Sequence, residues 1–356
     1  MGAKSRKWLV AGVAAVLVAF LAYHSRSLFT GFSLDRFVEA VRGANYSLLI
    51  LATICIYGCY ALRALRWQKF QAYVGPTSFL DIYAMTLAGF SALFLLGRAG
   101  EPIRPILIAR KENAPLPDTF GVYALERILD IASFAVLAAV GLLVFESTVH
   151  QTGSVASTFE KAAKSAGRGF SLFAVVAIGG IIYLRLHGSA FLERRMHAWK
   201  HSGGWKAKVA GILLGFVYGV QTIHTWSDAA FAALLSAVHW TLVVVVYFLV
   251  IHSFGGRLGS LTFTDAMLVL VFTMVGSAVQ LPGVGGGAQA LSIFALTKLF
   301  GVEQEPAIAA AFVLWLITFV SCSLAGVPLL LKEGFSLGNL KSLSEQERAR
   351  EQAQDI

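Results

Sequence analysis

The residues best suited to chemistry lie in a glycine- and proline-rich segment that follows an apolar stretch. Arg98 and Arg104 flank Glu101 in this segment, and Pro102 suits the first turn of a new helix. A helix that begins there offers free N–H groups to an anion, and two neighbouring arginines can clamp a phosphate. Glu101 can pair with the arginines or meet a cationic group. We predict a binding site at Arg98, Gly100, Glu101 and Arg104; the alternative is an interfacial loop that only touches lipid headgroups.

Three ionisable residues follow inside the next apolar stretch. Glu126 and Asp130 share a helix face at a spacing of four, and Arg127 can pair with Asp130 at a spacing of three. Charged groups at membrane depth are costly and usually face a cavity or a partner. Two interpretations stay open for Glu126, Arg127 and Asp130: a structural salt-bridge cluster, or the handling of a headgroup or a proton.

A second break, Pro-Gly-Val-Gly-Gly-Gly, occupies 282–287. Glycine-rich backbone can form an N–H nest for an anion, and a half-helix from Ala288 would point its N-terminus inward. Close helix packing or a hinge is the alternative. The candidate binding residues of this break are Gly283, Gly285, Gly286, Gly287 and Gln289.

No motif of an enzyme is present. The sequence has no Walker A, Gly-x-Ser-x-Gly or His-Glu-x-x-His pattern. Cys55, Cys59 and Cys322 lie in apolar runs, where thiols usually only pack. We therefore predict no catalytic residue, no metal and no cofactor.

Composition defines the class of protein that must position these residues. Of 356 residues, 57% are apolar and 14% charged, whereas an ordinary soluble domain is about a quarter charged. The long apolar runs do not alternate as the strands of a β-barrel would. A net charge of +9 suggests nucleic acid in a soluble protein, but here the basic residues lie between apolar runs, so we expect lipid contact and no nucleic acid. The sequence predicts an all-α, polytopic integral membrane bundle.

Apolar stretches that could cross or enter the membrane follow one another along the chain. Residues 8–23 read as an uncleaved first span, because a signal-peptide cleavage site is missing, and 209–226 is either a surface helix or an extra span. The basic segment 185–208 either contacts lipid headgroups at the inner surface or carries solvated charges that only set the orientation of the protein in the membrane. The remaining apolar stretches are 46–62, 79–97, 119–145, 169–186, 228–253, 263–281, 288–300 and 306–331.

Two pieces after the glycine breaks are too short to cross. Residues 288–300 would reach about 20 Å as a helix, against a hydrocarbon core of about 30 Å, and 101–111 is shorter still. If every stretch crosses in series, inner and outer loops carry 14 basic residues each. If 79–97 and 263–300 dip in and return, the counts are 20 inside and 8 outside, as the positive-inside rule expects. We therefore predict two re-entrant hairpins.

The two hairpins resemble each other. Asp81 and Asp265 each begin a stretch that meets its break 16 residues later. Hairpins from opposite faces imply an inverted repeat with a site near the midplane; chance similarity is the alternative. We predict one transmembrane domain over 1–331, with halves 46–145 and 228–331, a basic cytoplasmic linker 185–227 and a polar cytoplasmic tail 332–356.

The run GRAGEPIRPILIARKENAPLPDTFGVYALERILD resembles the first signature of the flippase-like family that includes the transmembrane region of lysylphosphatidylglycerol synthase. PGVGGGAQ is similar to the second signature, Pro-Gly-Gly-x-Gly-x-x-Glu, and Phe216 and Gly219 match part of a weaker element. The resemblance covers roughly 46–331. Gln289 replaces the usual Glu, and Trp315 stands where many members carry Arg. The first signature is matched at Gly97, Arg98, Gly100, Glu101, Arg104, Pro105, Glu126, Arg127 and Asp130.

The resemblance implies lipid translocation without synthesis, because no synthase domain is evident. We expect a multi-pass protein of the cell inner membrane with both termini cytoplasmic, whose partner is an anionic or aminoacylated phospholipid or a lipid-linked precursor. Two alternatives remain: a membrane enzyme of lipid-linked sugars, and a partner subunit of a glycolipid synthase.

Overall fold

The chain is a helical bundle. The computed structural model describes residues 32–149, 165, 167–176, 179–180, 183, 225–281, 283 and 285–334. Among these residues, five helical stretches are long and apolar enough to cross a membrane, which confirms the all-α polytopic class. They are Tyr46–Gln71, Phe79–Gly100, Leu116–Val144, Trp226–Ser253 and Gln304–Lys332.

Side-chain caps fix where several helices begin. The side chain of Asn45 accepts the N–H of Ser47 at the start of α3 (Tyr46–Gln71). Capping boxes open α10 (Trp226–Ser253) at Thr225 and α12 (Phe263–Gly276) at Thr262. A short amphipathic helix, α2 (Leu34–Arg42), precedes α3 and begins at Ser33.

The first hairpin consists of α4 (Phe79–Leu96), the 3₁₀ turn η1 (Gly97–Gly100) and α5 (Ile103–Lys111). Gly97 has φ of 62°, which favours glycine. A Cβ at Gly100 would lie 2.2 Å from the carbonyl oxygen of Ala92, so α5 can start close against α4 only with glycine there. Lys111 pairs with Asp81 at 3.8 Å, and therefore α4 begins where α5 ends.

The second hairpin consists of α12, the two-residue strands β1 (Gln280–Leu281) and β2 (Gly285–Gly286), and α13 (Gly287–Phe294). The strands pair antiparallel, with Leu281 opposite Gly285. A Cβ at Gly287 would lie 2.3 Å from the carbonyl oxygen of Gly276, so this return helix also starts against its outgoing helix. The apolar stretch 263–281 is not helical throughout: α12 ends at Gly276, and Gln280 and Leu281 pair with Gly286 and Gly285 in the β turn.

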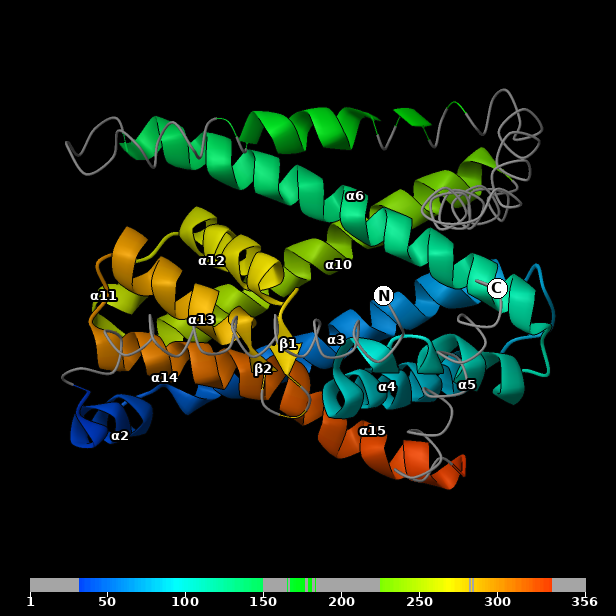
Figure 1. The fold of residues 1–356 in the computed structure, drawn as a ribbon, viewed down its shortest axis with the longest axis horizontal. Coiled ribbons are helices and arrows are strands. Elements are labelled where there is room, and N and C mark those ends of the chain that lie inside the picture. Colours follow the sequence, from blue (N-terminus) through cyan, green and yellow to red (C-terminus); the bar gives the residue numbers. More distant parts are fainter. Residues whose placement is uncertain are drawn as a thin grey trace, which may run out of the picture.

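The two hairpins open toward opposite ends of the bundle. Lys111 of the first also bonds to Glu333, at the end of α15 (Ser321–Lys332). At the other end of the bundle, α11 (Gly256–Gly259) lies beside the end of the second hairpin, where Arg257 donates to the carbonyl of Phe300 at 3.0 Å. Figure 1 shows α4 and α5 on one side, α12 and α13 on the other, and β1 and β2 between them.

The long helices enclose the hairpins. Helix α4 packs along α15, and α12 packs along α6 (Leu116–Val149). Helix α6 is longer at both ends than the predicted 119–145. The last span is α14 (Gln304–Trp315), a π-helical segment η3 (Leu316–Val320) and α15 in series. Another π-helical segment, η2 (Ala295–Leu299), ends the second hairpin.

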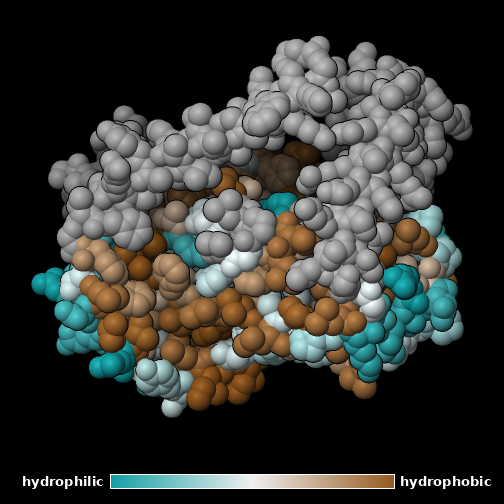
Figure 2. Space-filling model, turned by 60° about the horizontal axis from the view of Figure 1, so that its bottom comes forward, coloured by the Kyte–Doolittle hydropathy of each residue, from teal (hydrophilic) through white to brown (hydrophobic). Residues whose placement is uncertain are grey.

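Buried apolar side chains form two main clusters. The larger lies around α3, α10, α12 and α14 and includes Val244, Tyr247 and Leu268. The second includes Trp67 and Leu125 and lies at the other end of α3, against α4, α5 and α6. On the face in Figure 2, hydrophobic side chains cover the middle and hydrophilic ones gather toward the two ends, as expected of a membrane bundle.

Several sequence predictions concern residues that the structure does not describe. The span 8–23, the segments 185–208 and 209–224, the matches at Phe216 and Gly219, and the tail beyond 334 lie outside the described residues. Of 169–186, residues 169–176, 179–180 and 183 are described, and they are helical.

Candidate functional site

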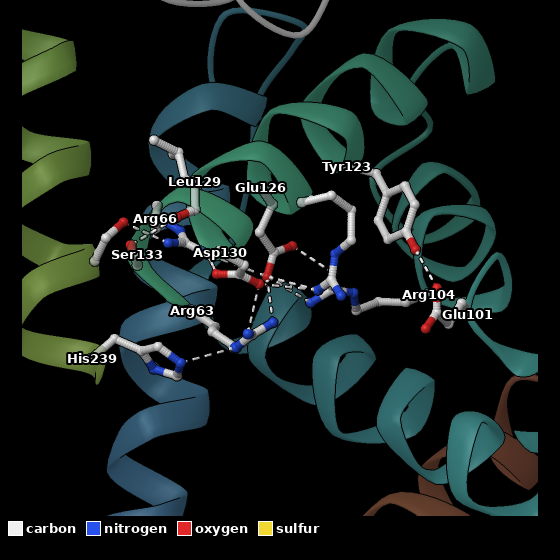
Figure 3. Close-up of polar contacts among 12 residues, drawn as sticks. Arg63, Arg66, Glu101, Arg104, Tyr123, Glu126, Leu129, Asp130, Ser133 and His239 are labelled. Carbon is white, nitrogen blue, oxygen red and sulfur yellow. Dashed lines mark hydrogen bonds and ion pairs between the residues drawn. The ribbon is translucent and has the colours of Figure 1, made fainter. Parts of the chain in front are cut away.

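Four arginines surround two carboxylates where α3, α5 and α6 meet (Figure 3). Helix α3 contributes two of the arginines, α5 contributes one, and α6 contributes the fourth together with both carboxylates. We call this set the arginine cluster; it consists of Arg63, Arg66, Arg104, Arg127, Glu126 and Asp130.

Glu126 is the carboxylate nearest the first hairpin. Its Oε1 accepts hydrogen bonds from Arg63 Nη1 at 2.8 Å and from Arg104 Nη1 at 3.1 Å, and Arg104 Nη2 bonds to its Oε2. The Arg104 interaction is therefore bidentate, which is the strong geometry for an arginine–carboxylate pair. Glu126 and Arg104 are both buried, so this ion pair ties α5 to α6.

Asp130 lies one turn further along α6 and joins α6 to α3. Its Oδ1 accepts from Arg66 Nη2 at 2.7 Å, and its Oδ2 accepts from Arg63 Nη2 at 2.7 Å. The predicted pair with Arg127 is also present, at 3.2 Å. Arg66 further donates to Ser236 Oγ of α10 at 2.6 Å, so a third long helix is bonded to the cluster.

Aromatic rings line the arginines. The guanidinium carbon of Arg104 lies 4.7 Å from the ring centre of Trp67 and 5.6 Å from that of Tyr123. Such cation–π contacts stabilise a cation that is removed from water. The absence of a side chain at Gly89 leaves room for Arg104, because a Cβ at Gly89 would lie 2.4 Å from Arg104 Cβ.

The cluster carries more positive than negative charge. Four arginines face two carboxylates, which leaves a formal excess of two positive charges. His239 adds no charge, because its Nε2 accepts from Arg63 Nε at 3.3 Å while Nδ1 faces the carbonyl of Cys59, the arrangement of a neutral ring. The buried Nε atoms of Arg66 and Arg127 have no hydrogen-bond partner among the described residues.

A small pocket opens beside the cluster. It holds about 20 Å³, enough for one water molecule. Arg104 lies deep in its wall with 5% of the side chain exposed, whereas Arg127 is 32% exposed and Glu101 25% exposed at its rim. The pocket is lined by Gly89, Phe90, Leu93, Glu101, Arg104, Tyr123 and Arg127.

The structure separates the two arginines that were expected to clamp one phosphate. Arg98 donates from Nη1 to Glu101 Oε1 at 2.7 Å, and Glu101 Oε2 also accepts from the Tyr123 hydroxyl at 3.2 Å. Arg104 instead points to Glu126. In this conformation Arg98 and Arg104 therefore hold different carboxylates, and the residue beside Arg104 at the pocket is Arg127.

The second break lies against the first but outside the arginine cluster. The N–H of Gly283 donates to the carbonyl of Phe94, that of Gly286 to Gln289 Oε1 at 2.6 Å, and that of Gly287 to Val279 O at 3.0 Å. These amides are occupied by protein acceptors, so they present no open anion nest. Gly285 has φ of 91° and lies so close to Gln289 that a side chain there would clash.

Sequence reasoning missed Arg63, Arg66 and His239 because the span was expected to end at 62. Helix α3 runs unbroken to Gln71, and the side chains of Arg63 and Arg66 are 10% and 3% exposed. A usable signal was present: two arginines three apart on one helix match two carboxylates four apart on another. No glycine or proline separates these arginines from the apolar residues before them.

Metal ligands do not gather in the described part of the chain. Within residues 32–149 and 225–334, apart from 282 and 284, no group of three or more His, Cys, Asp or Glu could hold a metal ion.

Comparisons with known proteins give one family and one curated relative. The family model described as lysylphosphatidylglycerol synthase TM region matches residues 8–326. The protein named glycosyltransferase AglD, from Haloferax volcanii, is 25% identical to this chain over 362 residues. The match covers 95% of this chain and 57% of that relative, so the chain spans little more than half of the relative's length.

Proposed function

The chain belongs to the family of the lysylphosphatidylglycerol synthase transmembrane region, and from this membership we propose that it binds the polar headgroup of a membrane lipid and carries it across the bilayer. The substrate is a phospholipid or a lipid-linked precursor. The chain is a multi-pass membrane protein, and the proposal gives it no chemical step of its own.

One observation carries the proposal: an excess of arginine beside a pocket within an apolar bundle. A buried cation without a counter-ion is costly, and intramembrane charges usually line a path for a substrate or an ion. The headgroup phosphate of a lipid supplies the missing negative charge. Arg127 and Glu101 at the rim of the pocket would meet the headgroup first, while Arg104 and Glu126 hold the wall in place.

The proposal includes two re-entrant hairpins in an inverted repeat. Its support is that the hairpins open toward opposite ends and that their turns touch, through Gly283 with Phe94 and through Arg98 Nη2 with Ser277 O at 3.0 Å. A headgroup would pass between the turns while the tails stay in lipid. Passage is passive or coupled to an ion.

Orientation in the inner membrane, with both termini in the cytoplasm, is part of the proposal. Three of the arginines counted on the inner surface, Arg63, Arg66 and Arg104, are buried in the cluster. Without them the count falls from 20 to 17 basic residues inside, against 8 outside. The asymmetry that supports this orientation remains.

The name of the relative favours a second candidate. A chain similar to part of a protein called a glycosyltransferase could be the membrane partner of an enzyme that builds lipid-linked sugars. Co-purification of a glycosyltransferase with the chain, without lipid movement in pure liposomes, would favour this candidate.

The test is reconstitution in liposomes with fluorescent anionic and cationic lipids whose sidedness is followed over time. We expect faster equilibration than in empty liposomes for at least one lipid. Arg98→Ala and Glu101→Ala should slow it, because Glu101 lines the pocket and Arg98 is the ion-pair partner of Glu101. Lys111→Ala is the matched control, since it removes a partly exposed ion pair with Glu333 at the end of the bundle.

Two results would overturn this assignment. If no lipid moves, translocation is wrong; if Arg98→Ala and Glu101→Ala both retain the full rate, the site is wrong. The hairpins are tested separately by labelling single cysteines in whole cells. Asp81→Cys and Lys111→Cys should react from one face and Ser260→Cys from the other, and labelling of Asp81→Cys and Lys111→Cys from different faces would exclude a re-entrant first hairpin.

A further inference from the structure

We propose that the arginine cluster selects headgroups that carry a phosphate with two negative charges, in preference to zwitterionic and cationic headgroups. This inference rests on the proposed function and specifies its substrate class. It departs from the aminoacylated lipid of the family's name, which carries a net positive charge.

The charge of the cluster is the first argument. Its formal excess is two positive charges, and the outer pair of Arg98 and Glu101 leaves that excess unchanged. A phosphate diester supplies one negative charge, whereas a phosphate monoester carries about −1.5 to −2 near neutral pH. A monoester or a pyrophosphate therefore neutralises the cluster, and a zwitterionic headgroup does not.

The hydrogen-bond balance is the second argument. The four oxygens of Glu126 and Asp130 already accept hydrogen bonds from Arg63, Arg66 and Arg104, and Arg127 forms an ion pair with Asp130. The buried Nε atoms of Arg66 and Arg127 nevertheless have no hydrogen-bond partner among the described residues. Arg127 also lines the pocket, so an acceptor that enters there meets the guanidinium group that carries one of the unmatched donors. A phosphate monoester brings three acceptor oxygens.

The third argument concerns cationic headgroups. Glu101 is the carboxylate that lines the pocket, and both of its oxygens are engaged, one by Arg98 at 2.7 Å and the other by Tyr123 at 3.2 Å. An ammonium group would have to displace Arg98 to reach it, and it would still face Arg104 and Arg127. The pocket therefore repels a cation.

The chemistry of the headgroup does not specify the hydrophobic tail, because a monoester phosphate can be attached to a glycerolipid or to a polyprenol. Purified full-length protein in nanodiscs should be titrated with fluorescent phosphatidic acid, phosphatidylglycerol, phosphatidylcholine and lysyl-phosphatidylglycerol of equal acyl chains, and with a polyprenyl phosphate. We expect at least one phosphomonoester to bind about tenfold more tightly than the diester, the ordinary effect of one further charge-assisted contact. Whichever monoester binds more tightly identifies the tail.

Arg127→Gln should remove most of the preference for the monoester over the diester, because it takes one charge from the excess at the pocket. Arg127→Lys keeps that charge and should keep the preference, and Lys111→Gln serves as a control at the end of the bundle. If Arg127→Gln does not fold, the wild-type panel alone still decides. Equal affinity for all headgroups, or tighter binding of lysyl-phosphatidylglycerol, would overturn the inference.

The two proposals fail in different ways. Liposomes that move lipids of every charge equally would contradict charge selection and leave translocation standing. A tenfold preference for a phosphomonoester in the binding assay, with no lipid moved in liposomes, would leave the selective site standing and exclude translocation.

Discussion

The backbone N–H of Gly283 donates to the carbonyl of Phe94 at 2.8 Å, which joins the turns of the two hairpins through their main chains. Arg98 adds a side-chain bond from the first turn to Ser277 O at the end of α12. Trp315, on the last span, packs its ring 5.9 Å from that of Phe94. The meeting point of the turns is thus held by three kinds of contact, only one of which uses a charged group.

Opening of this meeting point can be measured. Arg98→Ala removes the bond to Ser277 but leaves the main-chain bond of Gly283, so we expect faster hydrogen–deuterium exchange in 277–283. The free energy of unfolding should fall by less than about 1 kcal/mol, because the Arg98 side chain is half exposed. Unchanged exchange in this segment would show that Arg98 does not hold the turns together; exchange in α10 is the internal control.

Glu126 should be the most costly carboxylate to neutralise. Glu126→Gln leaves Arg104 without its buried counter-ion and Arg63 with Asp130 alone, and breaking a buried pair costs about 3–5 kcal/mol. Asp81→Asn, which weakens a partly exposed contact to Lys111, should cost less than about 1 kcal/mol. Thermal unfolding in detergent compares the two variants, and similar losses would contradict the buried position of Glu126.

A double variant refines that measurement. Combining Glu126→Gln with Arg104→Gln removes both members of the bidentate pair, so it should be less destabilising than the sum of the two single changes. Strict additivity would mean that the two side chains do not interact.

Substitution of Gly100 tests how closely the start of α5 packs against α4 in the first hairpin. Gly100→Ala places a Cβ 2.2 Å from Ala92 O, and we expect a loss of about 1–3 kcal/mol from overpacking. Gly121→Ala is the matched control: nothing lies within 4 Å of its new Cβ, and alanine favours helix. Equal stability of the two variants in thermal unfolding would exclude the tight contact between α4 and the start of α5.

The π-helical segment of the last span provides a fourth test. The buried Tyr60 hydroxyl of α3 donates to the carbonyl of Thr318 in η3 at 2.7 Å. Tyr60→Phe should cost about 1–3 kcal/mol, because it leaves that carbonyl without this partner. Tyr46→Phe, which removes an exposed hydroxyl bond to Val41, should be nearly neutral in the same unfolding assay. A neutral Tyr60→Phe would imply that another donor replaces the hydroxyl.

Local signals were enough for the parts of the fold that glycine, proline and apolar length specify. The return helix after Gly100 was predicted over 101–111 and is found at Ile103–Lys111, because Pro102 and the glycines mark its start. The end of α12 at Gly276 was not predicted, since the apolar residues Ala278, Val279 and Leu281 continue the stretch beyond it. The β turn depends instead on the pairing of Leu281 with Gly285.

The candidate site was predictable in part. The spacing of Arg127 and Asp130 on one helix predicts their ion pair, which is present. Arg104 pairs with Glu126, whereas Glu101 pairs with Arg98. The Arg104–Glu126 pair depends on how α5 packs on α6, and the spacing of residues in the sequence does not give the distance between two helices. Arg63 was placed outside the membrane because it is the first charge after an apolar run, although the helix does not end there.

The packing of α4 on α15 has a consequence for assembly. A Cβ at Gly326 would lie 2.2 Å from Leu87 O, and at Gly141 of α6 an added Cβ would touch Leu268 of α12, so each hairpin is seated on a long helix encoded in the other half of the sequence. Synthesis proceeds from the N-terminus, so segments that are made early lack their packing partners until the later segments have been made. The first hairpin therefore completes its burial only when the last span has entered the membrane, and a chain truncated before that span would leave the face of α4 that packs on α15 uncovered.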